Sequence, residues 1–199
     1  MVFLHNLTMA EILCRIVAAL LFSGLCGGIL VSVLRMMGDR HAVHEGRWSF
    51  NPFTHVALSG VFLAIAFRAA WMAPLPARRG GGRSLKPLLA VLITLGALCA
   101  LVPLLDFARP VVHAALPRSL GYMVLAEIEV LQRVLAGSVM IGLLPVPGML
   151  MGQALTSAFP QLEKRYRRWQ GFGMAGIAIL FILDWMPETA PLLALLRLV

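Results

Sequence analysis

Gly142-Leu-Leu-Pro-Val-Pro-Gly-Met-Leu-Met-Gly152 is the stretch that decides how this chain folds. It lies within a run without charged residues, from Val134 to Leu162, so lipid or buried protein is expected around it. Pro145 and Pro147 lack a backbone N–H and their rings clash with the preceding turn, whereas Gly148 accepts backbone angles that other residues avoid. Broken backbone at membrane depth is tolerated only where it is buried in protein or lines a cavity. We therefore expect the other helices to pack around this break.

The composition is that of an integral membrane protein. Of the 199 residues, 60% are hydrophobic and 13% are charged, which is unusual for a soluble domain. The length fits a single membrane domain, 1–199, without a separately folding soluble part. The net charge of +8 would suggest nucleic acid in a soluble protein. Here the basic residues gather in short loops between apolar runs, as anionic lipid and membrane topology require. The lipid bilayer is therefore the expected partner, and nucleic acid is not.

Uncharged runs predict an all-α bundle of about five transmembrane helices. A helix of about 20 residues, at ~1.5 Å per residue, crosses ~30 Å of hydrocarbon. The predicted spans are about 16–34, 52–68, 87–105, 120–150 and 169–186. The second begins at Pro52 because proline favours an extended residue before it, and the fourth is the helix broken at Pro145 and Pro147. The last residues, 189–199, are apolar but too short to span, so they are expected to lie at an interface.

Basic residues in the short loops indicate the orientation. The loops before the third and fifth spans hold more of them than the loops of the other side. The richer set is Arg78, Arg79, Arg83, Lys86, Lys164, Arg165, Arg167 and Arg168, and the poorer set is Arg35, Arg40, Arg47, Arg109 and Arg118. This distribution predicts that the N-terminus and the two richer loops are cytoplasmic.

Three segments in order along the chain carry the motifs of one family. Gly46-Arg-Trp-Ser-Phe-Asn-Pro-Phe-Thr-His55 is similar to the G-R-x-x-x-N-P-x-x-H segment of bacterial site-2 proteases, which are intramembrane zinc metalloproteases. Ala70-Trp-Met-Ala-Pro-Leu-Pro76 resembles the family's G-W-A-K-P-V-P, and Leu143-Leu-Pro-Val-Pro147 resembles its N-L-L-P-I-P-P-L-D-G. Order and spacing agree from about residue 16 to residue 185. The resemblance implies a site-2-protease-like bundle in the bacterial inner (plasma) membrane.

The resemblance also implies where a zinc site would lie, and the ligands are missing there. The family uses two His one helical turn apart, a Glu between them as general base, and a carboxylate as third ligand. The H-E-x-x-H positions fall on Cys26, Gly27 and Leu30. The Asp of L-D-G falls on Leu150. Catalytic zinc needs about three protein ligands, so the resemblance implies the scaffold of the protease and argues against its reaction.

Other histidines offer weaker sites. His41 and His44 form a pair at i,i+3 that zinc sites can use, which leaves open an active intramembrane zinc metalloprotease with unconventional ligands. A polar interfacial loop is the simpler interpretation, and no cofactor is then expected. His55 stands alone at the start of an apolar helix, where a hydrogen-bonded structural role is expected.

Three charges, Glu127, Glu129 and Arg133, fall inside the fourth hydrophobic segment. Such charges are costly in a membrane and mark a functional or paired site. Glu129 and Arg133 have the i,i+4 order that favours an ion pair. A small permease with a midplane site at the broken helix is one alternative, although no internal repeat supports it. An amphipathic portion at the membrane surface is the other.

The expected function is that of a pseudoprotease: a non-catalytic site-2-protease-like protein that binds a membrane partner or a transmembrane segment. The family receives an extended membrane segment beside its L-L-P-I-P helix, and small residues favour close helix contact in lipid. The groove is expected between the first helix and the break. Its candidate residues are Cys26, Gly27, Gly28, Asn51, His55, Pro145, Pro147 and Gly148.

Overall fold

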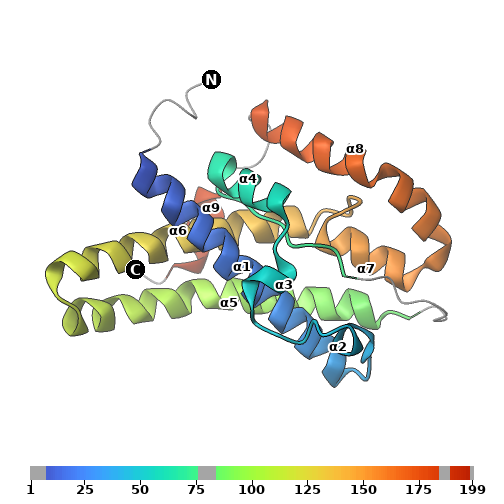
Figure 1. The fold of residues 1–199 in the computed structure, drawn as a ribbon, viewed down its shortest axis with the longest axis horizontal. Helices are drawn as coiled ribbons and strands as arrows, with labels where there is room; N and C mark the ends of the chain where they lie inside the picture. The colour runs from blue at the N-terminus through green and yellow to red at the C-terminus, as the bar shows by residue number, and fades with distance from the viewer. Residues whose placement is uncertain (1–7, 76–83, 184–188, 198–199) are drawn as a thin grey trace.

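The computed structural model describes residues 8–75, 84–183 and 189–197, and these form an all-helical bundle (Figure 1). Within these ranges the only β-type pairing is an isolated antiparallel bridge between Val56 and Met72. The helices are α1 (Met9–Met36), α2 (His41–His44), α3 (Pro52–His55), α4 (Leu58–Phe67), α5 (Lys86–Ala115), α6 (Arg118–Gly142), α7 (Leu150–Ala158), the 3-10 turn η1 (Pro160–Leu162), α8 (Glu163–Ile182) and α9 (Ala190–Leu196).

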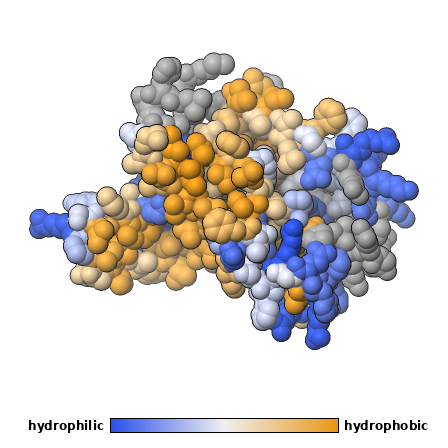
Figure 2. All heavy atoms as spheres, in the orientation of Figure 1, coloured by the Kyte–Doolittle hydropathy of each residue, from blue (hydrophilic) through white to orange (hydrophobic). Residues whose placement is uncertain are grey.

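Two of the described helices, α1 and α5, are long and apolar enough to cross a membrane. They correspond to the first and third predicted spans. Helix α4 and the part of α8 from Arg168 to Ile182 are apolar but shorter. Large hydrophobic side chains such as Phe53, Phe62 and Phe107 are exposed, and hydrophobic residues cover the middle of the face shown in Figure 2. These features support a membrane location, whereas five complete spans remain a prediction.

Helix α5 continues to Ala115, past the predicted end of the span at Leu105 and through Pro103 and Pro110. Residues 106–115, expected to form a loop, are helical, and the charged side chains here have partners. Arg109 Nε lies 3.2 Å from Asp106 Oδ1. Gln132 of α6 also donates a hydrogen bond to Asp106, at 2.8 Å.

The predicted second span, 52–68, is wrong as one continuous helix. It is divided into α3 and α4 at Val56, whose backbone is extended. After α4, Arg68 takes a left-handed conformation with φ +55°. Residues 69–75 then return alongside the segment they have just left, since Ala73 N donates to the His55 carbonyl at 2.7 Å and Met72 forms the bridge with Val56.

This return brings two basic loops to the same end of the bundle. Lys86 Nζ donates to the Met37 carbonyl at 2.8 Å, and Arg47 donates to the Pro74 carbonyl at 3.0 Å. The start of α8 also lies at this end, because Glu163 of α8 and Asp39 line one groove, which is described below. We call this the basic end; its described basic side chains are Arg35, Arg40, Arg47, Lys86, Lys164, Arg165 and Arg168. The expectation that Arg35, Arg40 and Arg47 lie across the membrane from Lys86 is therefore wrong.

The break at Pro145 and Pro147 is present. Helix α6 ends at Gly142 and α7 begins at Leu150, so the predicted fourth span, 120–150, is helical only as far as residue 142. Gly148 has φ +97°, which explains the need for glycine. The non-helical turn packs closely against α8. A Cβ added to Gly173 of α8 would clash with the Pro147 carbonyl oxygen.

The end of the chain returns to the bundle. Helix α8 corresponds to the predicted fifth span, 169–186, but begins at Glu163 and ends at Ile182; residues 184–186 lie outside the described part. Helix α9 packs on α5 and α6, and Leu193 is buried there. Arg197 then donates a hydrogen bond to Gln132 Oε1 at 3.1 Å.

Candidate partner groove

The glycine face of α1 is covered by the chain itself. A Cβ added to Gly27 would lie well under 3.0 Å from the His55 ring, and one added to Gly28 would lie equally close to the Phe50 ring. A Cβ added to Gly24 would likewise lie under 3.0 Å from the Phe50 carbonyl oxygen. The expectation that Gly27 and Gly28 belong to a partner groove is wrong, because Phe50 and His55 of the same chain occupy the space beside them.

The N-P-x-x-H segment explains how α3 is held against α1. The Asn51 side chain accepts a hydrogen bond from the Phe53 N–H at 3.0 Å and thereby caps the helix, while Pro52 occupies its first turn. His55 is 0% exposed, and its Nε2 lies 3.0 Å from the Ser49 carbonyl oxygen. Since a carbonyl only accepts, Nε2 carries the proton. Nδ1 has no hydrogen-bond partner in the described structure and faces Gly27. These contacts hold the segment against α1.

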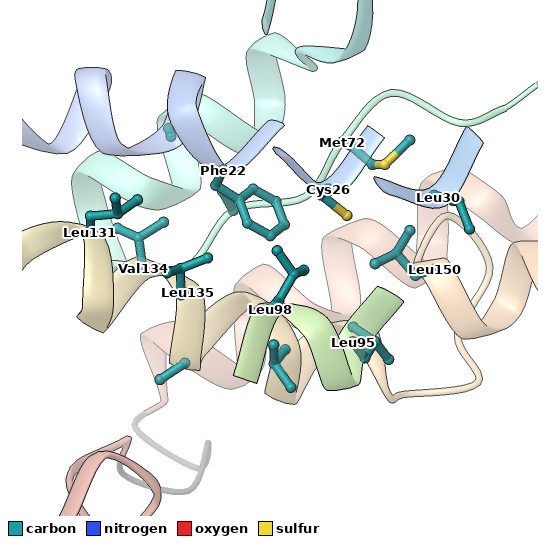
Figure 3. Packing of buried hydrophobic residues seen from close by; sticks show 14 of the residues in the cluster. Phe22, Cys26, Leu30, Met72, Leu95, Leu98, Leu131, Val134, Leu135 and Leu150 are labelled. Atoms are coloured by element: carbon teal, nitrogen blue, oxygen red, sulfur yellow. The ribbon is translucent and has the colours of Figure 1, made fainter. Parts of the chain in front are cut away.

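The positions that the resemblance assigns to zinc ligands come together in the hydrophobic core. Cys26 is 0% exposed, Leu30 3% and Leu150 5%, and all three belong to one cluster of buried residues with Met72 and Leu98. Figure 3 shows the Cys26 and Leu30 side chains on α1 and Leu150 on α7 around the same packed interior. This part of the fold is apolar.

The donor atoms present do not suit zinc. Among the residues that the structure describes, no three His, Cys, Asp or Glu side chains are grouped to hold a metal ion. Cys26 supplies one thiol among hydrocarbon side chains. His41 and His44 lie on α2, where His41 Nε2 is 3.5 Å from Glu45 Oε1 and His44 is exposed. The weaker histidine pair therefore lacks a third ligand in the described residues.

A groove of about 300 Å³ opens between α1, α5, α7 and the start of α8. Its apolar wall includes Leu30 and Leu34 of α1, Val91 of α5 and Leu150 of α7. The other lining residues are Asp39, His41, Ala42, Pro74, Leu75, Pro87, Pro147, Gly148, Gly152, Gln153, Ala154, Thr156, Ser157, Glu163, Tyr166 and Gln170. The groove thus lies between the first helix and the break, at the basic end of the bundle.

Gln153 joins two walls of this groove. Its Oε1 accepts a hydrogen bond from the Leu75 N–H at 3.2 Å, and its Nε2 donates to the Gly148 carbonyl at 3.0 Å. One amide therefore fixes the returning segment 69–75 to the turn that follows Pro147. Sequence reasoning missed this residue; the available signal was an amide within the uncharged run from Val134 to Leu162.

The predicted groove residues separate into two groups. Pro147 and Gly148 line the groove, and the Pro145 carbonyl nearby accepts a hydrogen bond from the Tyr166 hydroxyl at 3.1 Å. The remaining candidates, Cys26, Gly27, Gly28, Asn51 and His55, are absent from its lining. The groove instead touches α1 at the following turns, through Leu30 and Leu34.

The intramembrane charges are not part of the groove lining. Glu129 and Arg133 form the expected i,i+4 ion pair, at 2.5 Å, and both side chains are partly exposed. Glu127 lies beside Cys14 of α1. Gln132 of α6 is a fully buried polar side chain, and it accepts a hydrogen bond from Arg109 at 2.7 Å. The structure therefore does not bring the three predicted charges to the broken helix.

Comparisons of the sequence and the fold with known proteins find no significant match. No protein-family model matches the chain, no curated protein is significantly similar to it, and no solved structure is significantly similar to its fold. The site-2-protease resemblance therefore rests on the three sequence segments quoted above.

Proposed function

We propose that this chain is a non-catalytic, site-2-protease-like protein of the bacterial inner membrane that binds a membrane partner or a transmembrane segment in the groove. One observation carries the proposal. The core positions that match the family's ligands, Cys26, Leu30 and Leu150, are packed with hydrocarbon, while an open groove lies directly beside them and shares Leu30 and Leu150 with that core.

Two features argue against a hydrolytic reaction. Zinc that activates water needs about three protein ligands and an open fourth position. The apolar cluster around Cys26, Leu30 and Leu150 offers neither the ligands nor the open position. The general base of the family would stand at Gly27, where the His55 ring already fills the space of a side chain. A reaction of the site-2 type would thus require a rearranged core in addition to new ligands.

The size and walls of the groove suit a partner segment. Its volume of about 300 Å³ is at the lower limit of ligand pockets, which span ~300–1,000 Å³. It would therefore receive a few side chains of a segment rather than enclose a helix. Leu34 and Val91 offer apolar contact, and Gln153 and Tyr166 offer polar groups beside it. Such a mixture of apolar walls with a few polar groups is typical of binding sites.

Site-specific photo-crosslinking in native membranes tests this proposal. A photoreactive residue at Thr156, in the groove, should yield one discrete protein adduct, whereas the same residue at Val111, which is 66% exposed on α5, should capture lipid. Ser157→Trp should fill the groove and abolish the adduct. Ser119→Trp, at an exposed site of α6 outside the groove lining, is the matched control and should leave it intact. Capture of lipid alone at Thr156, or an adduct that survives Ser157→Trp, would contradict the proposal.

A further inference from the structure

Three arginines at the end of the bundle opposite the basic end pair with acidic side chains. Glu11 Oε1 lies 2.6 Å from Arg15 Nη2 and 2.9 Å from Arg68 Nη2. Asp106 pairs in the same way with Arg109 at 3.2 Å. Glu11 is shared by Arg15 and Arg68, so these five side chains keep a net charge of one, and the exposed Arg118 adds another.

At the basic end, three of the described cations have neutral partners. The Arg35 guanidinium lies 3.7 Å from the centre of the Trp48 ring, and Arg47 and Lys86 donate to the backbone carbonyls of Pro74 and Met37. Aromatic rings and carbonyls orient a cation without cancelling its charge. The described basic side chains of this end outnumber its acidic ones, which are Asp39, Glu45 and Glu163.

Two exposed tryptophans lie at the basic end. Trp48 is 53% exposed and Trp169 is 54% exposed, and Trp48 Nε1 donates to Ser32 Oγ, near the end of α1, at 3.3 Å. Tryptophan is enriched at the level of the lipid headgroups. Figure 2 shows hydrophilic side chains gathered at this end, to the right, beyond the hydrophobic middle. Tryptophan and basic residues together mark a membrane–water boundary here.

We infer that the basic end lies among the headgroups of the cytoplasmic leaflet and binds anionic phospholipids there. The N-terminal end of α1 then lies on the opposite side of the membrane, which reverses the orientation predicted for the N-terminus from the loop charges. Clustered Lys and Arg select the cytoplasmic side and attract anionic lipid. The returning segment 69–75 is the reason for this orientation, because it brings Arg35, Arg40 and Arg47 to the side of Lys86. The inference does not depend on what the groove binds.

Cysteine labelling in intact bacteria tests the orientation. The full chain, with Cys14, Cys26 and Cys99 replaced by Ala, carries either His44→Cys at the basic end or Ser119→Cys at the opposite end, both at exposed positions. A membrane-impermeant maleimide should label Ser119→Cys in intact cells and His44→Cys only after lysis. Labelling of His44→Cys in intact cells, with protection of Ser119→Cys, would overturn the inference.

Tryptophan quenching in vesicles tests the lipid preference. Full-length protein carrying Trp185→Phe keeps Trp48, Trp169 and the buried Trp71, whose emission is the same in every sample. It is reconstituted in phosphatidylcholine vesicles that contain equal fractions of brominated phosphatidylglycerol or brominated phosphatidylcholine. The anionic lipid should quench Trp48 and Trp169 several-fold more efficiently, and about 0.5 M salt should reduce this difference by screening. Lys164→Gln/Arg165→Gln/Arg168→Gln should also reduce it, whereas the control Arg118→Gln, at the opposite end, should not. Equal quenching by the two lipids, or a preference unaffected by the triple variant, would overturn the inference.

Discussion

The His55 ring occupies the space that a side chain on residue 27 would need. A Cβ built on Gly27 would lie well under 3.0 Å from His55 Cγ and Nδ1. The contact joins the N-P-x-x-H segment to the middle of α1 and explains why glycine is present there. Under the proposed site-2-protease resemblance, the same ring fills the position of the family's general base.

Gly27→Ala is expected to destabilise the protein. The added methyl group must displace the buried imidazole, and overpacking of this kind costs about 1–3 kcal/mol. The thermal unfolding midpoint in detergent, followed by size-exclusion chromatography with fluorescence detection, should fall by several degrees. His55→Ala added to Gly27→Ala should cost less than the sum of the two single changes.

Gly96→Ala is the matched control for this substitution. Gly96 lies on α5 with nothing within 4 Å of an added Cβ, and alanine is preferred to glycine in a helix by about 1 kcal/mol. Its unfolding midpoint should be equal to or above that of the wild type. Equal midpoints for Gly27→Ala and Gly96→Ala would show that His55 does not constrain α1.

Gln153→Leu is expected to loosen the groove. The substitution leaves the Leu75 N–H and the Gly148 carbonyl, whose bonds to the amide are partly buried, without that partner. An unsatisfied group costs up to about 1–3 kcal/mol when it is buried. Hydrogen exchange at the Leu75 amide should become faster by about tenfold or more, since ~1.4 kcal/mol corresponds to a factor of ten. Gln161→Leu, at an exposed position of η1, should leave this rate unchanged. An unchanged exchange rate at Leu75 in Gln153→Leu would show that the Gln153 side chain does not hold residues 69–75 in place.

Gln132 and Arg197 are expected to be energetically coupled. Gln132 is 0% exposed and connects α5, α6 and the segment after α9 through bonds to Asp106, Arg109 and Arg197. Gln132→Leu should cost about 2 kcal/mol or more, because it leaves charged groups with fewer partners. In a double-mutant cycle with Arg197→Met, the two effects should be non-additive by about 0.5 kcal/mol or more. Additive effects would show that the chain end is not held by this contact.

The sequence was sufficient for features with a strong local cause. Pro145 and Pro147 stand two residues apart and are followed by Gly148, and this combination predicts the break. A single interior proline is not enough, since α5 continues through Pro103 and Pro110. Uncharged runs of sufficient length predict α1 and α5. Asn51 followed by Pro52 likewise predicts the start of a helix, although α3 ends four residues later.

The features that the sequence did not reveal depend on long-range contacts. The return of residues 69–75 begins at Arg68, whose backbone is in the left-handed conformation. It is held by Ser138 of α6, whose hydroxyl accepts a hydrogen bond from the Ala70 N–H at 2.8 Å. Neither residue signals a reversal by its type. The glycines at 27 and 28 predict close packing, but the pattern cannot tell whether another protein or the same chain supplies the neighbour.

The zinc content of the purified protein, measured by elemental mass spectrometry, tests the central claim most directly. The measurement compares the wild type with Cys26→His/Leu30→His/Leu150→Asp, which restores three ligands at the positions that meet in the core, and with a control in which Leu30→Gln replaces Leu30→His. We predict no stoichiometric zinc in the wild type or the control, and about one zinc per chain in the triple variant. About one zinc per chain in the wild type, lost when His41 and His44 are replaced together, would contradict the account, as would a folded triple variant with no more zinc than the control.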